Sequence, residues 1–179
     1  MSSSRSDKIV AYSAMLTAVV ALLVAIFELH ENRKFQRLSV QPYLELSNSN
    51  QDGYQKFLIN TGLGPARIES VVVKVDEQRV FDWAQVVKNL TGESNVSILY
   101  SGVWTGRQLK AEEIVNLVRV EQKDVAVKLF TNDQRLNISV CYCSIYQDCW
   151  IKVNSAKPLS VEQCSENPAD RFPAVRTTE

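Results

Sequence analysis

The sequence predicts a mainly β protein, in which an N-terminal transmembrane helix is followed by an antiparallel β-sandwich with one short inserted helix. Three observations predict this fold class. Residues 9–27 form an uncharged apolar run, the chain beyond Pro42 breaks into short β-branched and aromatic runs separated by turn residues, and no repeated strand–helix–strand spacing follows. We expect five segments: an N-terminal tail (1–8), the transmembrane helix (9–27), a juxtamembrane helical stalk (28–40), the β-sandwich domain (41–164) and a flexible tail (165–179).

The apolar run at 9–27 has the length of a membrane span. Its nineteen residues would form a helix of about 28 Å, close to the thickness of the hydrocarbon core of a bilayer. A cleaved signal peptide is disfavoured because the run ends in AIFE rather than in an A-x-A-like cleavage site. A buried core helix is disfavoured because only three hydroxyl side chains interrupt the apolar surface, those of Tyr12, Ser13 and Thr17. The run therefore predicts an uncleaved signal anchor.

Five alanines recur along this run at spacings of three, four, three and four: Ala11, Ala14, Ala18, Ala21 and Ala25. This spacing places all five on one heptad seam of the helix. Helices inside a bilayer associate through close approach of their backbones, which a stripe of small residues permits. We expect the seam to pack against another transmembrane protein or against a second copy of the chain. The alternative is that alanine serves only as apolar filler.

The residues after the run are expected to continue the helix as a stalk, because 28–37 contain neither Gly nor Pro and Pro42 prevents further extension. Orientation is indicated by two opposing signals. Basic residues on both sides of the run slightly favour a cytoplasmic domain, whereas four cysteines in the last quarter of the chain favour an oxidising compartment. We expect a single-pass protein of the inner (plasma) membrane, with its N-terminus inside and its globular domain periplasmic or otherwise extracytoplasmic.

The chain beyond Pro42 reads as a series of strands. We expect strands at 43–47, 54–60 and 66–75, the last with a bulge or burial on both faces, and then a short helix at 79–90. Further strands are expected at 96–102 and at 114–120, where Ile114, Asn116, Val118 and Val120 alternate and the one polar member indicates a sheet edge. Residues 123–132 fit a strand or a helix, and 136–146 with 149–153 form a hairpin around Gln147 and Asp148. About seven short strands predict an immunoglobulin-like antiparallel sandwich.

Two short motifs support this fold by resemblance. INTGLGPARIESVVVKV, residues 59–75, resembles the Asn-x-Gly and Pro-Ala-x-Ile turn and strand of bacterial immunoglobulin-like adhesion or accessory domains. The anchor followed by RLSVQPYLEL, residues 37–46, resembles single-pass bacterial membrane proteins of unassigned function. The resemblance covers residues 33–75 and the hairpin at 140–153. It implies the sandwich fold and a bacterial origin, and it carries no catalytic residues.

The four cysteines are Cys141, Cys143, Cys149 and Cys164. Cys141 and Cys143 place their sulfurs on the same face of one strand, so we do not expect them to bond each other. If Cys143 faces Cys149 across the hairpin, Cys141 is left for Cys164, although four cysteines permit three connectivities. Buried free thiols and a four-thiolate metal site are alternatives, but the spacing lacks the paired C-x2-C motifs of structural zinc. We expect two disulfides and no metal or cofactor.

Several function classes find no support in the sequence. The 20 basic and 20 acidic residues balance without a long run of either sign, which argues against nucleic-acid binding. The single histidine, His30, follows the apolar run, and no G-x-S-x-G or H-E-x-x-H motif is present, so we expect no enzyme and no catalytic residues. GLGP at 62–65 lacks the lysine and hydroxyl of a P-loop, and is expected to form a tight turn in which Gly62 or Gly64 adopts a positive φ.

These features together predict a membrane-anchored accessory or interaction subunit. Its helix would dock on a membrane complex through the alanine seam, and its β-sandwich would present a binding surface outside the membrane for protein–protein interaction. The alternative is a ligand- or peptide-binding sensor module anchored in the membrane. Three glycosylation sequons, at Asn89, Asn95 and Asn137, would matter only in a eukaryotic secretory setting.

Overall fold

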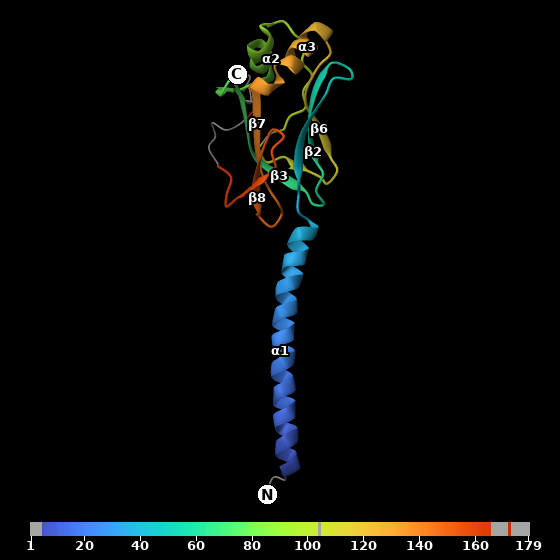
Figure 1. The fold of residues 1–179 in the computed structure, drawn as a ribbon, viewed down its shortest axis with the longest axis vertical. Coiled ribbons are helices and arrows are strands. Elements are labelled where there is room, and N and C mark those ends of the chain that lie inside the picture. The colour runs from blue at the N-terminus through green and yellow to red at the C-terminus, as the bar shows by residue number, and fades with distance from the viewer. Residues whose placement is uncertain (1–4, 104, 166–171, 173–179) are drawn as a thin grey trace, which may run out of the picture. The chain divides into compact units, whose positions relative to one another are not determined.

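The computed structural model describes residues 5–103, 105–165 and 172 (Figure 1). The chain divides into two compact units, Met1–Ser39 and Val40–Glu179. The first unit contains one long apolar helix, and the second contains two antiparallel sheets with short helices. This coarse fold is the one that the sequence predicts.

Helix α1 (Arg5–Ser39) runs without interruption for 35 residues. The hydroxyls of Ser13 and Thr17 each donate a hydrogen bond of 2.9 Å to a backbone carbonyl one turn earlier. They therefore satisfy their hydrogen-bonding capacity within the helix and need no outside partner. α1 begins before the apolar run, continues through the expected stalk and ends three residues before Pro42, whose ring cannot continue a helix.

All strand pairings of the two sheets are antiparallel. The three-stranded sheet has the order β1-β2-β6 and consists of β1 (Leu44–Ser49), β2 (Tyr54–Asn60) and β6 (Ile114–Val120). The six-stranded sheet has the order β4-β3-β7-β8-β9, with β5 also paired to β3. Its strands are β3 (Ala66–Val75), β4 (Gln78–Val80), β5 (Gln108–Leu109), β7 (Leu136–Cys143), β8 (Cys149–Val153) and β9 (Leu159–Val161).

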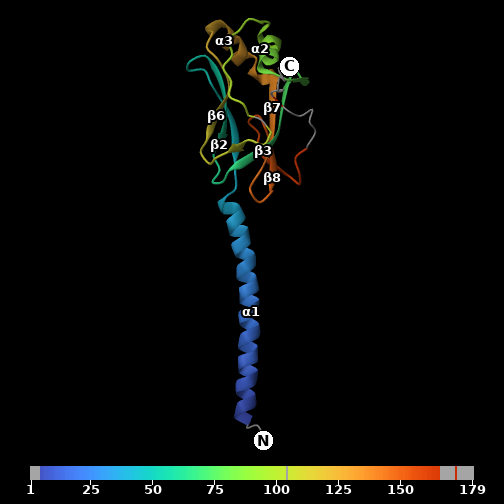
Figure 2. The ribbon, with the colours of Figure 1, turned by 180° about the vertical axis from the view of Figure 1, so that it is seen from behind.

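Two α-helices interrupt the described strands, where the sequence predicts one. α2 (Trp83–Thr91) and α3 (Lys123–Thr131) contact each other and lie side by side at one end of the β domain in both views (Figures 1 and 2). A 3-10 turn, η1 (Asp133–Arg135), follows α3. The ambiguous segment at 123–132 is helical because its buried residues, Val125, Ala126 and Leu129, recur at helical spacing.

The predicted helix at 79–90 begins later than expected. The Asp82 side chain accepts a hydrogen bond of 2.8 Å from the backbone N–H of Gln85, which fixes the helix start at Trp83. Residues before this cap form strand β4 instead. At the other end Gly92 adopts φ 79°, a left-handed conformation that favours glycine, and terminates α2.

Two strand predictions need correction. The segment at 96–102 is not a strand, and only Leu99 makes an isolated bridge, to Arg119 of β6. In β6 the pairing with β2 shifts so that Lys56 faces Val118 and Phe57 faces Asn116, which leaves Leu117 between them as a bulge. Because the bulge reverses the alternation, Val115 is buried and Ile114 is 62% exposed. The bulge expected in β3 is present at 68–70.

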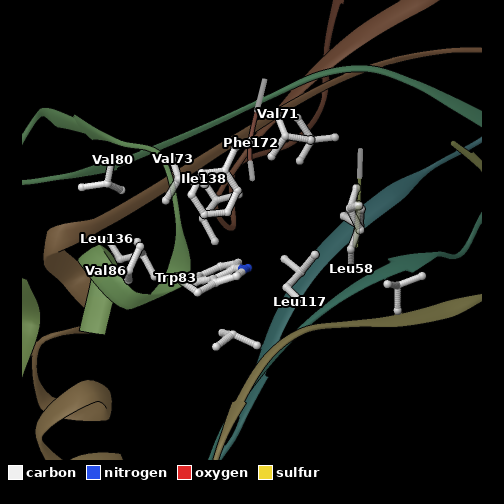
Figure 3. Close-up of a cluster of buried hydrophobic side chains, with 14 of the residues drawn as sticks. Leu58, Val71, Val73, Val80, Trp83, Val86, Leu117, Leu136, Ile138 and Phe172 are labelled. Atoms are coloured by element: carbon white, nitrogen blue, oxygen red, sulfur yellow. The ribbon is translucent and has the colours of Figure 1, made fainter. Parts of the chain in front are cut away.

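The core lies between the two sheets and under α2. Trp83 of α2 packs edge-on against Phe172, with ring centroids 5.1 Å apart, among aliphatic side chains from both sheets (Figure 3). Tyr142 of β7 stacks on Trp150 of β8 at 5.7 Å, and its hydroxyl accepts a hydrogen bond of 3.4 Å from the backbone N–H of Leu44 in β1. The two sheets are thus joined by apolar packing and by a buried polar contact.

The turn at 61–65 is organised by Asn60, which is fully buried. Its side-chain oxygen accepts from the backbone N–H groups of Tyr43 and Gly62, and its side-chain nitrogen donates to three carbonyl oxygens, including that of Gly64 at 2.8 Å. The expectation of a positive φ at Gly62 or Gly64 is wrong. Glycine is needed because a Cβ on Gly64 would overlap the carbonyl oxygen of Val40, and one on Gly62 the backbone nitrogen of Tyr43.

Candidate functional site

Residues 9–27 of α1 present an apolar surface. Asp7–Ser39 is long and apolar enough to span a membrane, and its most apolar window has a mean hydropathy of 2.5 with none of it buried. Even the large side chains are exposed, from 47% at Val19 to 73% at Tyr12. The apolar residues at 9–27 lie on all sides of the helix, whereas a surface helix of a water-soluble protein keeps a polar face.

The five alanines predicted to form a helix-packing seam lie within the helical part of this surface, and all are exposed. At about 100° per residue their spacing confines them to an arc of about 80° around the helix axis. They therefore form a narrow stripe along which another backbone can approach closely. Those residues are Ala11, Ala14, Ala18, Ala21 and Ala25.

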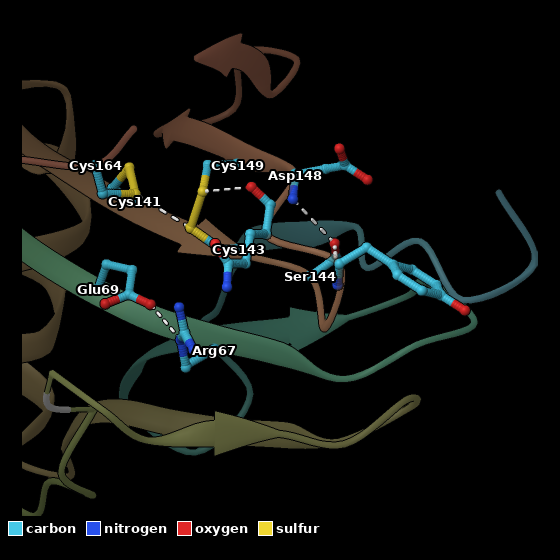
Figure 4. A network of polar contacts seen from close by, with 10 residues as sticks. Arg67, Glu69, Cys141, Cys143, Ser144, Asp148, Cys149 and Cys164 are labelled. Atoms are coloured by element: carbon cyan, nitrogen blue, oxygen red, sulfur yellow. Dashed lines mark hydrogen bonds and ion pairs between the residues drawn. A yellow bond between two sulfur atoms is a disulfide. The ribbon is translucent and has the colours of Figure 1, made fainter. Parts of the chain in front are cut away.

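The four cysteines form a second candidate site, on the six-stranded sheet. Cys141 is bonded to Cys164 and Cys143 to Cys149, which is the pairing that the hairpin geometry favours in the sequence (Figure 4). Cys143 and Cys149 are direct cross-strand partners in β7 and β8, with Cα atoms 4.1 Å apart. The two disulfides touch, since Sγ of Cys143 lies 3.8 Å from Sγ of Cys164.

These cysteines form a small core of their own. Tyr142 points toward the main core while its neighbours Cys141 and Cys143 occupy the opposite face of β7, as the alternation of a strand requires. All four cysteines are buried, at 3–6% exposure, and Ile151 and Val161 pack against them. The last part of β7 is consequently buried on both faces.

A partly buried polar network links β2 to η1. Asp133 lies 2.5 Å from both the ammonium of Lys56 and the hydroxyl of Tyr54, and its second oxygen accepts from the side chain of Asn48 at 3.1 Å. Burial, together with the negative charge of Asp133, raises the pKa of Tyr54 far above its ordinary value. Lys56 is 6% exposed, so its charge depends on Asp133 for compensation. This network stabilises the connection between α3 and β7.

A surface cleft of about 750 Å³ lies beside α3. The β1–β2 turn and the end of β6 form its other walls, and Val127 and Phe130 of α3 line it while remaining 65% and 45% exposed. Arg119 and Glu121 lie at its rim as an ion pair of 3.1 Å. The cleft therefore combines apolar surface with charges of both signs, as small-ligand and peptide sites do.

The sequence does not reveal the cleft or the Lys56–Asp133 network. Their residues come from segments far apart in the chain, with 77 positions between Lys56 and Asp133, and neither set forms a local motif. His30 lies exposed on α1.

The chain matches no protein-family model, no curated protein and no solved structure.

Proposed function

We propose that this chain is a single-pass protein of the inner (plasma) membrane, anchored by α1, that serves as an accessory or interaction subunit of a membrane complex. One observation carries the proposal: the apolar window of Asp7–Ser39 has a mean hydropathy of 2.5, and the helix is long and apolar enough to cross a membrane. Transfer of this surface into lipid removes the cost of exposing it to water.

The length of α1 fits an anchor with a stalk. Its 35 residues reach about 52 Å, whereas the hydrocarbon core of a bilayer takes about 30 Å. The apolar residues at 9–27 account for the span, and the polar residues that follow extend the helix beyond it.

The alanine stripe supports a helical partner within the membrane. Lipid chains are as apolar as leucine, so helices associate there by packing rather than by exclusion from water. The stripe is about 80° wide, from the 100° rotation per residue of an α-helix, and its small side chains let one helix backbone approach closely. The partner that fits is another transmembrane helix, from a larger complex or from a second copy of this chain.

The two disulfides support an extracytoplasmic β domain, because disulfides persist in oxidising compartments. The immunoglobulin-like form of the sandwich belongs to the same proposal. It is supported by two antiparallel sheets that share one core, a common design of extracellular interaction modules. We propose no catalytic role for the chain.

Disruption of the alanine stripe tests the proposed partner. We expect the double substitution Ala18→Leu and Ala21→Leu to abolish co-purification of a stoichiometric membrane protein, or of a differently tagged copy of the chain, in mild detergent. The matched control is Val20→Leu with Val24→Leu, which adds bulk to the other side of the same helix. The proposal of a helical partner fails if both double variants retain the partner equally.

A second function, ligand or peptide sensing, is favoured by the cleft beside α3. Its volume of about 750 Å³ and the exposed Phe130 suit a small amphipathic ligand. A ligand screen by thermal shift should then find compounds that stabilise the wild-type domain and not Phe130→Ala. Leu159→Ala, an exposed leucine outside the cleft, is the control. Hits that stabilise all three proteins equally would argue against a site in this cleft.

A further inference from the structure

Three of the four disulfide-bonded cysteines bring their sulfurs close enough together to serve as ligands of one metal ion if they were reduced. The Sγ atoms of Cys143, Cys149 and Cys164 all lie within 4.8 Å of one another. Cys141 is bonded to Cys164, so its sulfur lies beside the same group. Zinc holds thiolate sulfurs at about 2.3 Å in a tetrahedron, which puts any two of them about 3.8 Å apart. The measured separation between Cys143 and Cys164 is 3.8 Å.

We propose that reduction of both disulfides converts this cluster into a four-thiolate site for one Zn²⁺ ion per chain. The proposal rests on the positions of the sulfurs, the strands that carry them and their burial. It does not depend on a helical partner of α1, and it applies where a dithiol reductant reaches the β domain. Its ligands would be Cys141, Cys143, Cys149 and Cys164.

The scaffold holds three of these ligands without help from the disulfides. Cys143 and Cys149 are cross-strand partners, and Cys141 lies two residues before Cys143 on the same face of β7. The ladder hydrogen bonds of β3, β7 and β8 keep these strands in register whether or not the sulfurs are bonded. Only Cys164, on the segment after β9, depends on the cluster for its position.

The surroundings suit a closed structural site. The four side chains are 3–6% exposed, and Ile151 and Val161 shield them from water. Arg67 of β3 is the direct cross-strand partner of Cys143, so its guanidinium lies on the cysteine face of the sheet, where it is paired with Glu69 (Figure 4).

The chemistry balances with a dithiol as reductant. Each disulfide takes two electrons and two protons from one dithiol, which closes to its own cyclic disulfide, so two dithiols yield four cysteine thiols. Binding of one Zn²⁺ then releases four protons and leaves a site of charge −2. The sulfurs cannot be bonded in disulfides and ligate zinc at once, so the thiol redox poise around the domain selects between the two states.

Metal titration of the full-length chain in detergent tests the proposal. After anaerobic reduction with dithiothreitol and removal of the reductant, Co²⁺ should bind at one equivalent with the absorption bands of tetrahedral thiolate coordination, and Zn²⁺ should displace it. Cys143→Ser should weaken zinc binding by on the order of 100-fold, and Ser160→Ala, an exposed position on β9, should not change it. The oxidised chain should bind no metal at this site.

Circular dichroism and tryptophan fluorescence, recorded with each titration, show whether the chain is folded. Each metal-binding result then either supports or contradicts the proposal. A reduced chain that remains folded and binds no zinc overturns the proposal. If the reduced chain unfolds, one equivalent of zinc should restore the folded signal, and failure to do so also overturns it. Equal zinc binding by the oxidised chain or by Cys143→Ser would show adventitious binding elsewhere and would contradict the proposal as well.

Discussion

The two compact units of this chain use the same apolar residue types in opposite ways. Leu22 in α1 is 61% exposed, whereas Leu58 in β2 is fully buried between the sheets. The β domain covers its leucines and valines with its own strands and helices, and α1 covers none of its side chains. The difference lies in what covers the apolar side chains: the β domain supplies its own apolar interior, and α1 by itself supplies none.

The largest expected effect comes from placing charges within α1. Val19→Arg together with Leu22→Arg should lower the stability of membrane insertion by about 5–7 kcal/mol, since each arginine at the centre of a spanning helix costs about 2.5–3.5 kcal/mol. Membrane fractionation should find the double variant outside the membrane fraction. Val19→Leu with Leu22→Val, which keeps the helix apolar, should fractionate as wild type does. Normal insertion of the arginine variant would contradict the view that the apolar surface of α1 is the part of the chain that enters the membrane.

Truncation of one leucine in each unit tests whether the stability of the β domain depends on its own core alone. Leu58→Ala should lower the free energy of unfolding of the β domain by about 2–5 kcal/mol, because it leaves a cavity in a packed core. Leu22→Ala should leave that free energy unchanged within about 0.5 kcal/mol, since its side chain belongs to the other unit. Urea unfolding followed by tryptophan fluorescence measures both. Equal losses in the two variants would mean that the units do not stabilise themselves separately.

Removal of either disulfide has a smaller expected effect on stability. The disulfide that closes the longer loop should contribute more. Cys141→Ser with Cys164→Ser opens a loop with a sequence separation of 23 and should cost about 3.4 kcal/mol of unfolding free energy. Cys143→Ser with Cys149→Ser opens one with a separation of 6 and should cost about 2.2 kcal/mol. Chemical unfolding of the oxidised proteins provides the comparison. The reverse order would show that packing of the sulfurs, rather than chain entropy, determines their contribution.

A further effect is confined to alkaline pH and to the β domain. Burial raises the pKa of Tyr142 to about 12, from an ordinary value of 10.0. The folded chain thus keeps a proton that the unfolded chain releases, so this tyrosine stabilises the fold fully below pH 10, and the contribution is lost as pH rises from 10 to about 12. The stability advantage of wild type over Tyr142→Phe should therefore shrink across this range.

Lys152 also contributes to the pH dependence of stability. Burial lowers its pKa, so its contribution to the stability of the fold increases as pH rises, opposite to that of Tyr142. Lys152 is present in both proteins, so its contribution cancels in the difference. A difference between wild type and variant that stays constant from pH 9 to 12 would contradict a buried, protonated Tyr142.

Local signals in the sequence predict much of this structure. An uninterrupted apolar run is enough to predict α1, and alternating residues on either side of Gln147 and Asp148 are enough to predict the β7–β8 hairpin. The cysteine pairing follows from that hairpin, because the strand register brings Cys143 opposite Cys149. These features depend on residues close together in the chain.

Features that depend on distant residues could not be predicted. The Asp133 network joins positions 77 and 79 apart, and Asn60 bonds to carbonyl oxygens that lie up to 50 positions away. Periodicity contains no information about such partners. The error at Gly62 and Gly64 has a similar cause: a turn glycine can be required by a positive φ or by close approach of another backbone segment, and the sequence does not distinguish the two. In β6, the bulge at Leu117 depends on the partner strand.

The most direct test of the account is the fate of α1 in the mature protein. Native membranes should be extracted with alkaline carbonate, and the chain that remains should be analysed by intact mass and N-terminal peptide mapping. A membrane anchor predicts that the chain resists extraction and that residues 9–27 are still attached to it. A chain released by carbonate, or a mature form that lacks the apolar run, would contradict the central claim.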